Sequence, residues 1–184
     1  MRSKKMWIGL AILAVVVIAV FLYLNNRTRT LSPPGEEQLT SGGVTVTVTY
    51  SRPSVRGRLI FGTEDQDALQ PYGKYWRLGA NEATEITFNR DVLFNGSPVK
   101  AGTYRMYAVP GADAFELVLN TAVGESGSSE PDDEKDVLRT KVATQQTSAP
   151  VEQFTISLSP EGQGIEMVFE WSNTRFVVPV RVAG

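Results

Sequence analysis

The sequence contains no cysteine and no histidine among its 184 residues. Without cysteine it cannot form disulfides, use a thiol nucleophile or build a thiolate zinc site. Without histidine it lacks the commonest general base and the commonest metal ligand of proteins. Ser-His-Asp catalysis, Cys-His catalysis and His-containing zinc sites are therefore excluded. We expect no metal site and no cofactor, and we identify no catalytic residue.

Charged residues are absent from one long stretch near the N-terminus. Met6–Leu24 is a run of 19 uncharged residues, and as a helix it spans about 28 Å, enough to cross a hydrocarbon core of about 30 Å. Trp7 and Tyr23 stand near its ends, where amphipathic rings favour the membrane interface. The alternative, a cleaved signal peptide, has a shorter apolar core and a small-residue cleavage site. The exit sequence FLYLNNRTR offers no such site, which favours an uncleaved transmembrane signal anchor.

Basic residues flank this segment unequally and predict its orientation. Arg2, Lys4 and Lys5 precede it, whereas Arg27 and Arg29 follow it. By the positive-inside rule, residues 1–5 form a cytoplasmic tail and the chain after the segment lies outside. We therefore expect a single-pass protein of the cytoplasmic (inner) membrane, held there through Met6 to Leu24, with a periplasmic C-terminal domain.

The remainder of the chain is acidic. Residues 32–184 carry 13 Lys and Arg against 20 Asp and Glu, a net charge of −7. This balance argues against nucleic acid as a partner, because nucleic-acid-binding domains need a basic surface. It also argues against direct adhesion to anionic lipid headgroups.

The positions of the prolines and of the alternating apolar residues divide the chain after the apolar segment into a linker and a domain. Residues 25–41 contain two consecutive prolines and few apolar residues, which indicates a linker. Residues 42–184 form one domain of short strands, beginning with the alternating Val44–Tyr50. Asn95-Gly96 is a tight-turn signal, and Ser172-Asn173 is a second candidate hairpin. The other expected strands are Ala83–Phe88, Asp91–Phe94, Gly102–Val109, Phe115–Asn120, Asp136–Thr144, Val151–Ser159, Gly164–Trp171 and Thr174–Val182.

No stretch after the apolar segment shows sustained helical periodicity. Thr63–Tyr75 is expected to be a long loop that contains at most one helical turn. The predicted fold class is all-β: an antiparallel, jelly-roll-like β-sandwich preceded by one N-terminal transmembrane helix.

Two segments carry the candidate binding residues. Arg52, Arg56 and Arg58 follow the first strand and are suited to bind a carboxylate or phosphate, because guanidinium groups bind such anions bidentately. The alternative is a solvated loop whose arginines pair with the surplus acids. The second segment is Trp76–Glu85, whose candidates are Trp76, Arg77, Asn81, Glu82 and Glu85.

Three roles are open for this second segment. A Glu82–Arg77 pair would fix a structural corner, because a partly buried charge needs a partner. The same polar residues would otherwise contact a ligand. In the third role, Glu82 and Glu85 are the paired acids of a glycoside hydrolase. Residues three apart on an extended chain lie on opposite faces, which disfavours this role.

Two further features have a structural and a functional interpretation. Glu125–Asp136 holds six acids, yet lacks the spacing and central glycine of an EF-hand, so we expect a mobile, solvated loop rather than a calcium site. Tyr72, Tyr75, Trp76 and Trp171 are suited to form a stacking platform for a sugar, but at least half of them are expected in the core.

Several blocks of the sequence resemble a bacterial family known only as a domain of unknown function, found in exported proteins. The blocks are SRPSVRGR…IFG, PYGKYWRLGANEATEITF, AGTYRMYAVPG, DVLR and PVEQFTI, within Val44–Val182. The resemblance implies a compact, sandwich-like β-domain and no established activity. After Asn120 the chain has TAVGESGSS where members often carry Trp-Gly. The motif positions are Arg52, Pro53, Ser54, Gly57, Tyr72, Gly73, Trp76, Arg77, Gly79, Ala80, Asn81, Glu82, Ala83 and Thr84.

Two functions from different classes follow from these observations. The first is a non-enzymatic binding or scaffold module of the cell envelope, whose partner is an envelope glycan or another protein. The alternative is a carboxylate-dependent hydrolase that acts on envelope glycans through Glu82 or Glu85 and a second acid.

Overall fold

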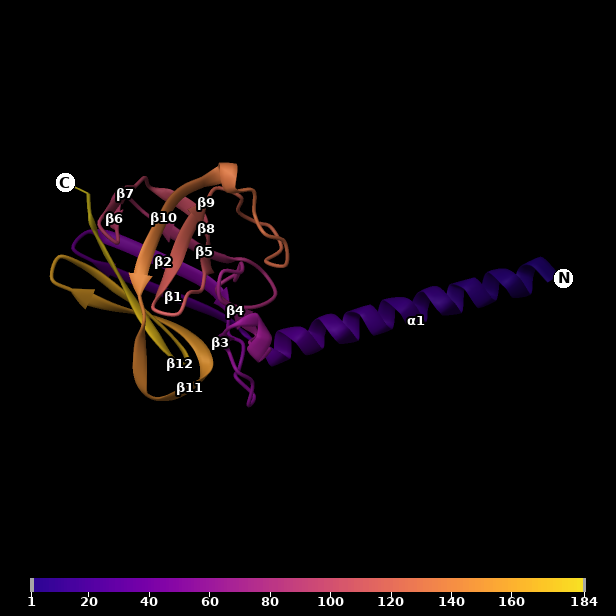
Figure 1. Ribbon diagram of the computed structural model, residues 1–184. Helices are drawn as coiled ribbons and strands as arrows, with labels where there is room; N and C mark the ends of the chain where they lie inside the picture. The colour runs from indigo at the N-terminus through magenta and orange to yellow at the C-terminus, as the bar shows by residue number, and fades with distance from the viewer. Residues whose placement is uncertain (1, 184) are drawn as a thin grey trace.

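The computed structural model describes residues 2–183 and consists of one long N-terminal helix and a mostly β domain (Figure 1). Helix α1 (Arg2–Leu31) projects away from the domain, and its side chains from Met6 to Leu24 are exposed. Its apolar length is enough to cross a membrane, as expected for a membrane anchor or a signal sequence. The expected cytoplasmic tail, residues 1–5, lies outside the residues whose side chains are described.

The linker expected over residues 25–41 is replaced by regular structure. Helix α1 continues to Leu31, and strand β1 (Pro34–Ser41) pairs along its whole length with β2 (Val44–Ser51). The prolines mark the junction instead of a flexible spacer: Pro33 follows the helix, and Pro34 opens an edge strand, where a missing N–H is tolerated. The low apolar content that indicated a linker reflects the exposure of an edge strand and a helix end.

The larger sheet has six antiparallel strands in the order β1-β2-β5-β8-β9-β10. Its other members are β5 (Thr84–Phe88), β8 (Gly102–Val109), β9 (Ala114–Asn120) and β10 (Asp136–Ala143). The alternation predicted for β2 is confirmed, because Val44, Val46, Val48 and Tyr50 are all buried on one face.

The smaller sheet has four strands in the order β11-β12-β6-β7. It contains β11 (Gln145–Glu161), β12 (Gly164–Val182), β6 (Val92–Phe94) and β7 (Ser97–Val99). The turn at Asn95-Gly96 is confirmed: it joins β6 to β7, and both residues have the positive φ, 48° and 81°, that such hairpins require.

The hairpin expected at Ser172-Asn173 is wrong. The segments on either side of it belong to one continuous strand of 19 residues, β12, which pairs with the 17-residue strand β11. Ser172 has a φ of 54°, and the register with β11 shifts beside it, so these residues form an irregularity within the strand. A turn signal was present, but the long partner strand overrides it.

The remaining elements are short. Strands β3 (Phe61–Gly62) and β4 (Gln70–Pro71) pair in parallel, with the 3-10 turn η1 (Glu64–Gln66) between them, and a second turn, η2 (Asp133–Lys135), precedes β10. Both sheets contribute side chains to one hydrophobic core; examples are Val46, Ile86 and Leu117 from the larger sheet and Phe154, Phe169 and Val178 from the smaller.

Candidate functional site

The two segments that carry the candidate binding residues meet the C-terminal end of α1. Arg56 Nη2 donates to the carbonyl oxygen of Leu31 at 3.2 Å, and Asn81 Nδ2 donates to that of Ser32 at 3.3 Å. Glu82 pairs with Arg29 of the helix at 2.5 Å. Carbonyl groups at a helix C-terminus lack intrahelical partners and attract cations, which explains the placement of Arg56. These contacts hold the helix end against the domain.

The backbone of both segments is tightly curved. Arg56, Leu78 and Asn81 have φ values between 51° and 57°, a region that side chains other than glycine seldom adopt. Gly79, with φ 150°, lies against β2, so that a Cβ atom there would stand 2.6 Å from the carbonyl oxygen of Ser51. The Oγ1 atom of Thr84 donates to the carbonyl oxygen of Leu78 at 2.6 Å and closes the bend. Glycine is therefore needed at position 79 for close approach as well as for its conformation.

A pocket of about 350 Å³ opens between the two segments and the helix end. Three arginines contribute to its wall: Arg56 and Arg58 from the first segment and Arg77 from the second. No aspartate or glutamate stands among its lining residues, which are Thr28, Leu31, Ser32, Pro53, Ser54, Arg56, Arg58, Leu69, Gln70, Arg77, Gly79, Ala80, Asn81 and Trp171. We call it the arginine pocket.

The guanidinium groups of the arginine pocket bond to neutral oxygens. Arg58 donates to the carbonyl oxygens of Ser54 and Val55, at 2.6 and 3.0 Å, and Arg77 donates to that of Asn81 at 3.3 Å. Within the described part of the chain, no carboxylate forms an ion pair with Arg56, Arg58 or Arg77. Ion pairs between these guanidinium groups and the surplus acids are therefore not found among the described residues, although the backbone N–H of Arg56 donates to a carboxylate oxygen of Glu152 at 3.0 Å. The pocket wall carries an excess of positive charge.

Two candidate residues, Trp76 and Arg52, have structural contacts. Trp76 is 2% exposed, bridges to Ala108 and stacks on Trp171, so it belongs to the core. Arg52 lies across β11, where it donates to Thr155 Oγ1 at 3.3 Å and to the carbonyl oxygen of Phe154 at 3.5 Å. The proposed sugar platform is not assembled, because Trp76 and Trp171 are both enclosed.

Neither candidate glutamate lines the arginine pocket. Glu82 pairs with Arg29 rather than with Arg77, so the expected Arg77–Glu82 pair is wrong. Glu85 accepts a hydrogen bond from the backbone N–H of Gly124 at 2.5 Å. Glu82 lines a neighbouring pocket of about 370 Å³ together with Glu125, and Arg77 and Asn81 contribute to the walls of both pockets.

The loop before β10 is largely exposed, as expected of a solvated loop, but Gly127 and Pro131 are buried within it. Gly127 is buried, and a Cβ atom there would stand 2.8 Å from the carbonyl oxygen of Glu82. Beneath the loop, Arg105 is fully buried: its guanidinium pairs with Glu125 at 3.5 Å and donates to Tyr75 Oη at 2.5 Å and to the carbonyl oxygen of Ser129. The burial of Arg105 was not predictable from the sequence, because Arg105 lies on the face of β8 opposite the core residues Tyr104, Met106 and Ala108.

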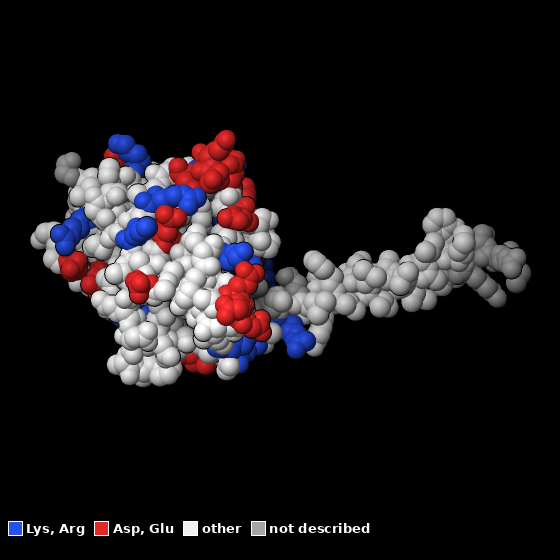
Figure 2. Space-filling view, in the orientation of Figure 1, with Lys and Arg blue, Asp and Glu red and all other residues white. Residues whose placement is uncertain are grey.

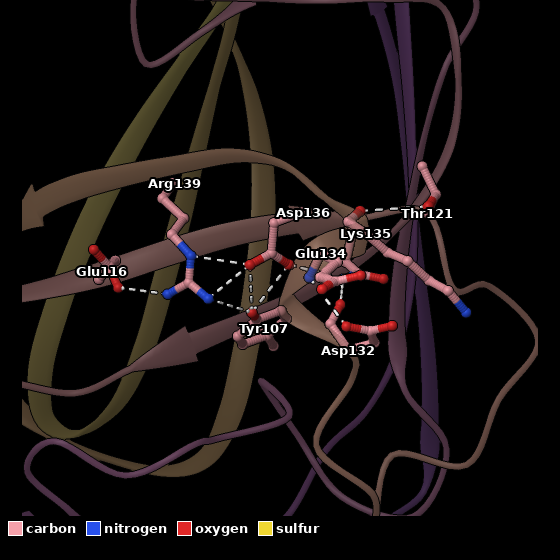
Figure 3. A network of polar contacts seen from close by, with 9 residues as sticks. Tyr107, Glu116, Thr121, Asp132, Glu134, Lys135, Asp136 and Arg139 are labelled. Atoms are coloured by element: carbon pink, nitrogen blue, oxygen red, sulfur yellow. Dashed lines mark hydrogen bonds and ion pairs between the residues drawn. The ribbon is translucent and has the colours of Figure 1, made fainter.

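A polar network fixes the end of that loop (Figure 3). The carboxylate of Asp136 accepts hydrogen bonds from Tyr107 Oη at 3.0 Å, Asn120 Nδ2 at 2.7 Å and Arg139 Nε at 2.9 Å, and Arg139 also pairs with Glu116. Burial, reinforced by the nearby carboxylate of Asp136, raises the pKa of Tyr107 well above its usual value. With its carboxylate fully engaged, Asp136 has a structural role.

Acidic side chains gather around this loop at the upper right of the domain (Figure 2). They do not form a metal site: among the described residues, no three acidic side chains lie close enough together to hold a metal ion.

Comparison with known proteins gives one finding. The family model described as "Protein of unknown function (DUF2911)" matches residues 32–180. No curated protein and no solved structure matches the chain.

Proposed function

Since the chain belongs to the family of proteins of unknown function DUF2911, we propose its role from the geometry of the molecule alone. It is a membrane-anchored binding module of the cell envelope, with its β domain on the periplasmic side of the cytoplasmic membrane, and it binds an anionic ligand in the arginine pocket. The two sheets with one shared core support a jelly-roll-like sandwich as the scaffold.

Membrane anchoring is supported by α1 itself. Its side chains from Met6 to Leu24 are apolar apart from a glycine and have no protein contact that would bury them. Such a surface is stable in hydrocarbon and unfavourable in water. The excess of basic residues before the segment supports the inside position of the N-terminus.

The single observation that carries the binding proposal is the charge of the arginine pocket. Three arginines line a space of about 350 Å³ that no acidic residue lines, in a domain with a net charge of −7. Grouping uncompensated cations costs free energy through mutual repulsion, and an anion removes that cost. A carboxylate or phosphate group fits this arrangement, because guanidinium groups bind both bidentately.

Titration of the full-length chain in an uncharged detergent tests the proposal. Glucuronate, inorganic phosphate and neutral glucose are added separately, and binding is followed by calorimetry. We expect at least one anion to bind and glucose not to bind. Loss of one arginine in Arg77→Gln weakens binding about tenfold, whereas Arg90→Gln, an exposed arginine outside the pocket, leaves it unchanged. Absence of binding by both anions would rule out the arginine pocket as an anion site.

A carboxylate-dependent hydrolase is the second candidate, favoured by one observation: Glu82 and Glu125 line the same pocket of about 370 Å³. Each of these carboxylates already pairs with an arginine, Arg29 and Arg105 respectively, which disfavours the protonated acid that glycoside hydrolysis needs. Release of reducing sugar from envelope glycans by the wild type, but not by Glu82→Gln, would establish hydrolysis. Equal release by both proteins would exclude Glu82 from it.

A further inference from the structure

We infer that the ligand of the arginine pocket is a phosphate group, carried by the headgroup of a lipid of the same membrane that α1 crosses. This inference rests on the proposed function and names the chemistry and the source of its anion. It depends on the height of the pocket above the membrane, the rigid connection of the helix to the domain, and the side chains at the rim.

The pocket lies at the level of lipid headgroups when α1 spans a membrane. The apolar segment ends at Leu24, and Thr28 lines the pocket four residues later, a rise of about 6 Å along a helix. The headgroup layer on each side of a bilayer is about 5–7 Å thick. The wall that Thr28 contributes is therefore within reach of the phosphate groups of the lipids around the helix.

The connection between helix and domain keeps the pocket at that level. Arg56 and Asn81 each donate to a carbonyl group at the end of α1, and Arg29 pairs with Glu82. The backbone N–H of Arg52 adds a bond to the carbonyl oxygen of Pro33 at 2.9 Å. Because both candidate binding segments contact the end of α1, the domain cannot rotate freely about the helix. The arginine pocket therefore stays beside the helix end, on the side of the membrane.

The rim carries apolar side chains as well as arginines. Leu59 and Leu69 are 48% and 38% exposed, their backbones are joined by a hydrogen bond, and Leu69 lines the pocket. Exposed leucines beside arginines match the mixed apolar and anionic environment at a bilayer surface.

Acidic residues in η1 and directly after it limit the contact that the domain makes with an anionic membrane surface. Glu64, Asp65 and Asp67 are exposed between the two leucines, and they oppose broad adhesion to an anionic surface. Binding of one phosphate group in the arginine pocket is compatible with these acids, because the phosphate contacts only the residues around the pocket and not the whole surface of the domain. The net charge of the domain therefore does not exclude a lipid ligand.

The test uses the full-length chain in micelles of an uncharged maltoside detergent. Phosphatidylglycerol or a phosphate-free diglucosyl diacylglycerol is added, and bound lipids are counted by native mass spectrometry. A parallel sample is titrated with inorganic phosphate and followed by the ³¹P line width. The variant Arg58→Gln with Arg77→Gln removes two pocket charges but leaves the contact of Arg56 with the helix intact, and Arg58→Lys with Arg77→Lys retains the charge.

We expect the wild type to retain phosphatidylglycerol over the glycolipid by about tenfold or more, the glutamine variant to lose this preference, and the lysine variant to keep part of it. Arg90→Gln serves as the matched control and behaves as wild type. If free phosphate binds but the two lipids are retained equally, the lipid inference is wrong while the anion site stands. If neither phosphate nor phospholipid binds and the glutamine variant equals the wild type, the lipid inference and the proposed anion site are both wrong.

Discussion

The indole rings of Trp76 and Trp171 stack with their centroids 5.8 Å apart and their planes 20° apart. Trp76 belongs to the WRLGANEAT segment and bridges to β8, whereas Trp171 lies on β12 and lines the arginine pocket. The stack therefore connects the two sheets directly beneath the pocket. Both rings are almost fully enclosed, so Trp171 contributes a buried apolar floor to the pocket.

Truncation of Trp76 should destabilise the domain strongly. Trp76→Ala removes a large, 2% exposed side chain that contacts Trp171, Phe154 and Phe61, and such changes cost about 3–5 kcal/mol of unfolding free energy. Urea unfolding of the full-length chain in detergent measures the loss. Trp7→Ala is the control, because Trp7 is 67% exposed on α1. A loss below about 1 kcal/mol for Trp76→Ala would contradict its core role.

Gly79 should tolerate substitution far less well than Gly57. Both have positive φ, so alanine at either position incurs a conformational cost of about 1 kcal/mol. Only at Gly79 would the added Cβ also meet backbone, the carbonyl oxygen of Ser51 at 2.6 Å, whereas nothing lies within 4 Å at Gly57. We expect the midpoint of thermal unfolding to fall several degrees further for Gly79→Ala. Equal midpoints would show that the close approach to β2 is not essential.

Glu82 should be coupled to Arg29 and not to Arg77. The Arg29–Glu82 pair is 2.5 Å long, but both side chains are 58% exposed, so water screens it, and we expect a coupling free energy of about 0.2–1 kcal/mol. A double-mutant cycle with Arg29→Gln and Glu82→Gln measures it, and the same cycle with Arg77→Gln should give additive losses. Strong coupling in the second cycle alone would mean that Glu82 pairs with Arg77.

Alkaline pH should weaken the network around Asp136. The pKa of Tyr107 is raised in the folded protein, chiefly by burial and then by Asp136, whereas an unfolded tyrosine titrates near about 10. The folded state therefore keeps this proton when the unfolded state loses it, and its stabilising contribution, complete below about pH 10, declines as the pH rises further. Unfolding measured from pH 8 to 11 should show a steeper decline for wild type than for Tyr107→Phe. Identical slopes would contradict the shift.

The orientation of the anchor is open to a direct test in cells. A C-terminal fusion to a reporter that is active only outside the cytoplasm should be active, and one to a reporter active only inside should not. The N-terminal sequence of the purified protein should begin before the apolar segment. A soluble chain beginning after Leu24 would instead establish a cleaved signal peptide.

The features that the sequence alone could predict depend on local patterns. The 19 uncharged residues of Met6–Leu24 predict an apolar helix from composition, and the alternation of Val44–Tyr50 predicts one buried strand face. The Asn95-Gly96 turn follows from the ability of both residues to adopt positive φ. At Ser172-Asn173 a similar local signal failed, because pairing with a long neighbouring strand outweighs a local turn preference.

The candidate site was predictable only in its residue types. Arg56, Arg77 and Asn81 were identified as binding candidates, and all three line one pocket, yet their common position beside the end of α1 depends on contacts between distant segments. Trp76 could not be told from a ligand contact by sequence, since aromatic rings occur both in cores and in binding sites. The partners of Glu82 and Arg105 depend on the tertiary structure, because Arg29 comes from the end of α1 and Glu125 from the loop before β10.

The sequence by itself determined an apolar N-terminal helix, a mostly β domain and the negative net charge of that domain, because composition and short-range periodicity act on neighbouring residues. Only the tertiary structure decided that three arginines of this acidic domain share one pocket without a carboxylate, and that the pocket adjoins the helix. The physical reason is that electrostatic free energy depends on distances in space. Net charge sums over the whole chain, whereas a ligand responds to the charges within a few ångströms of it.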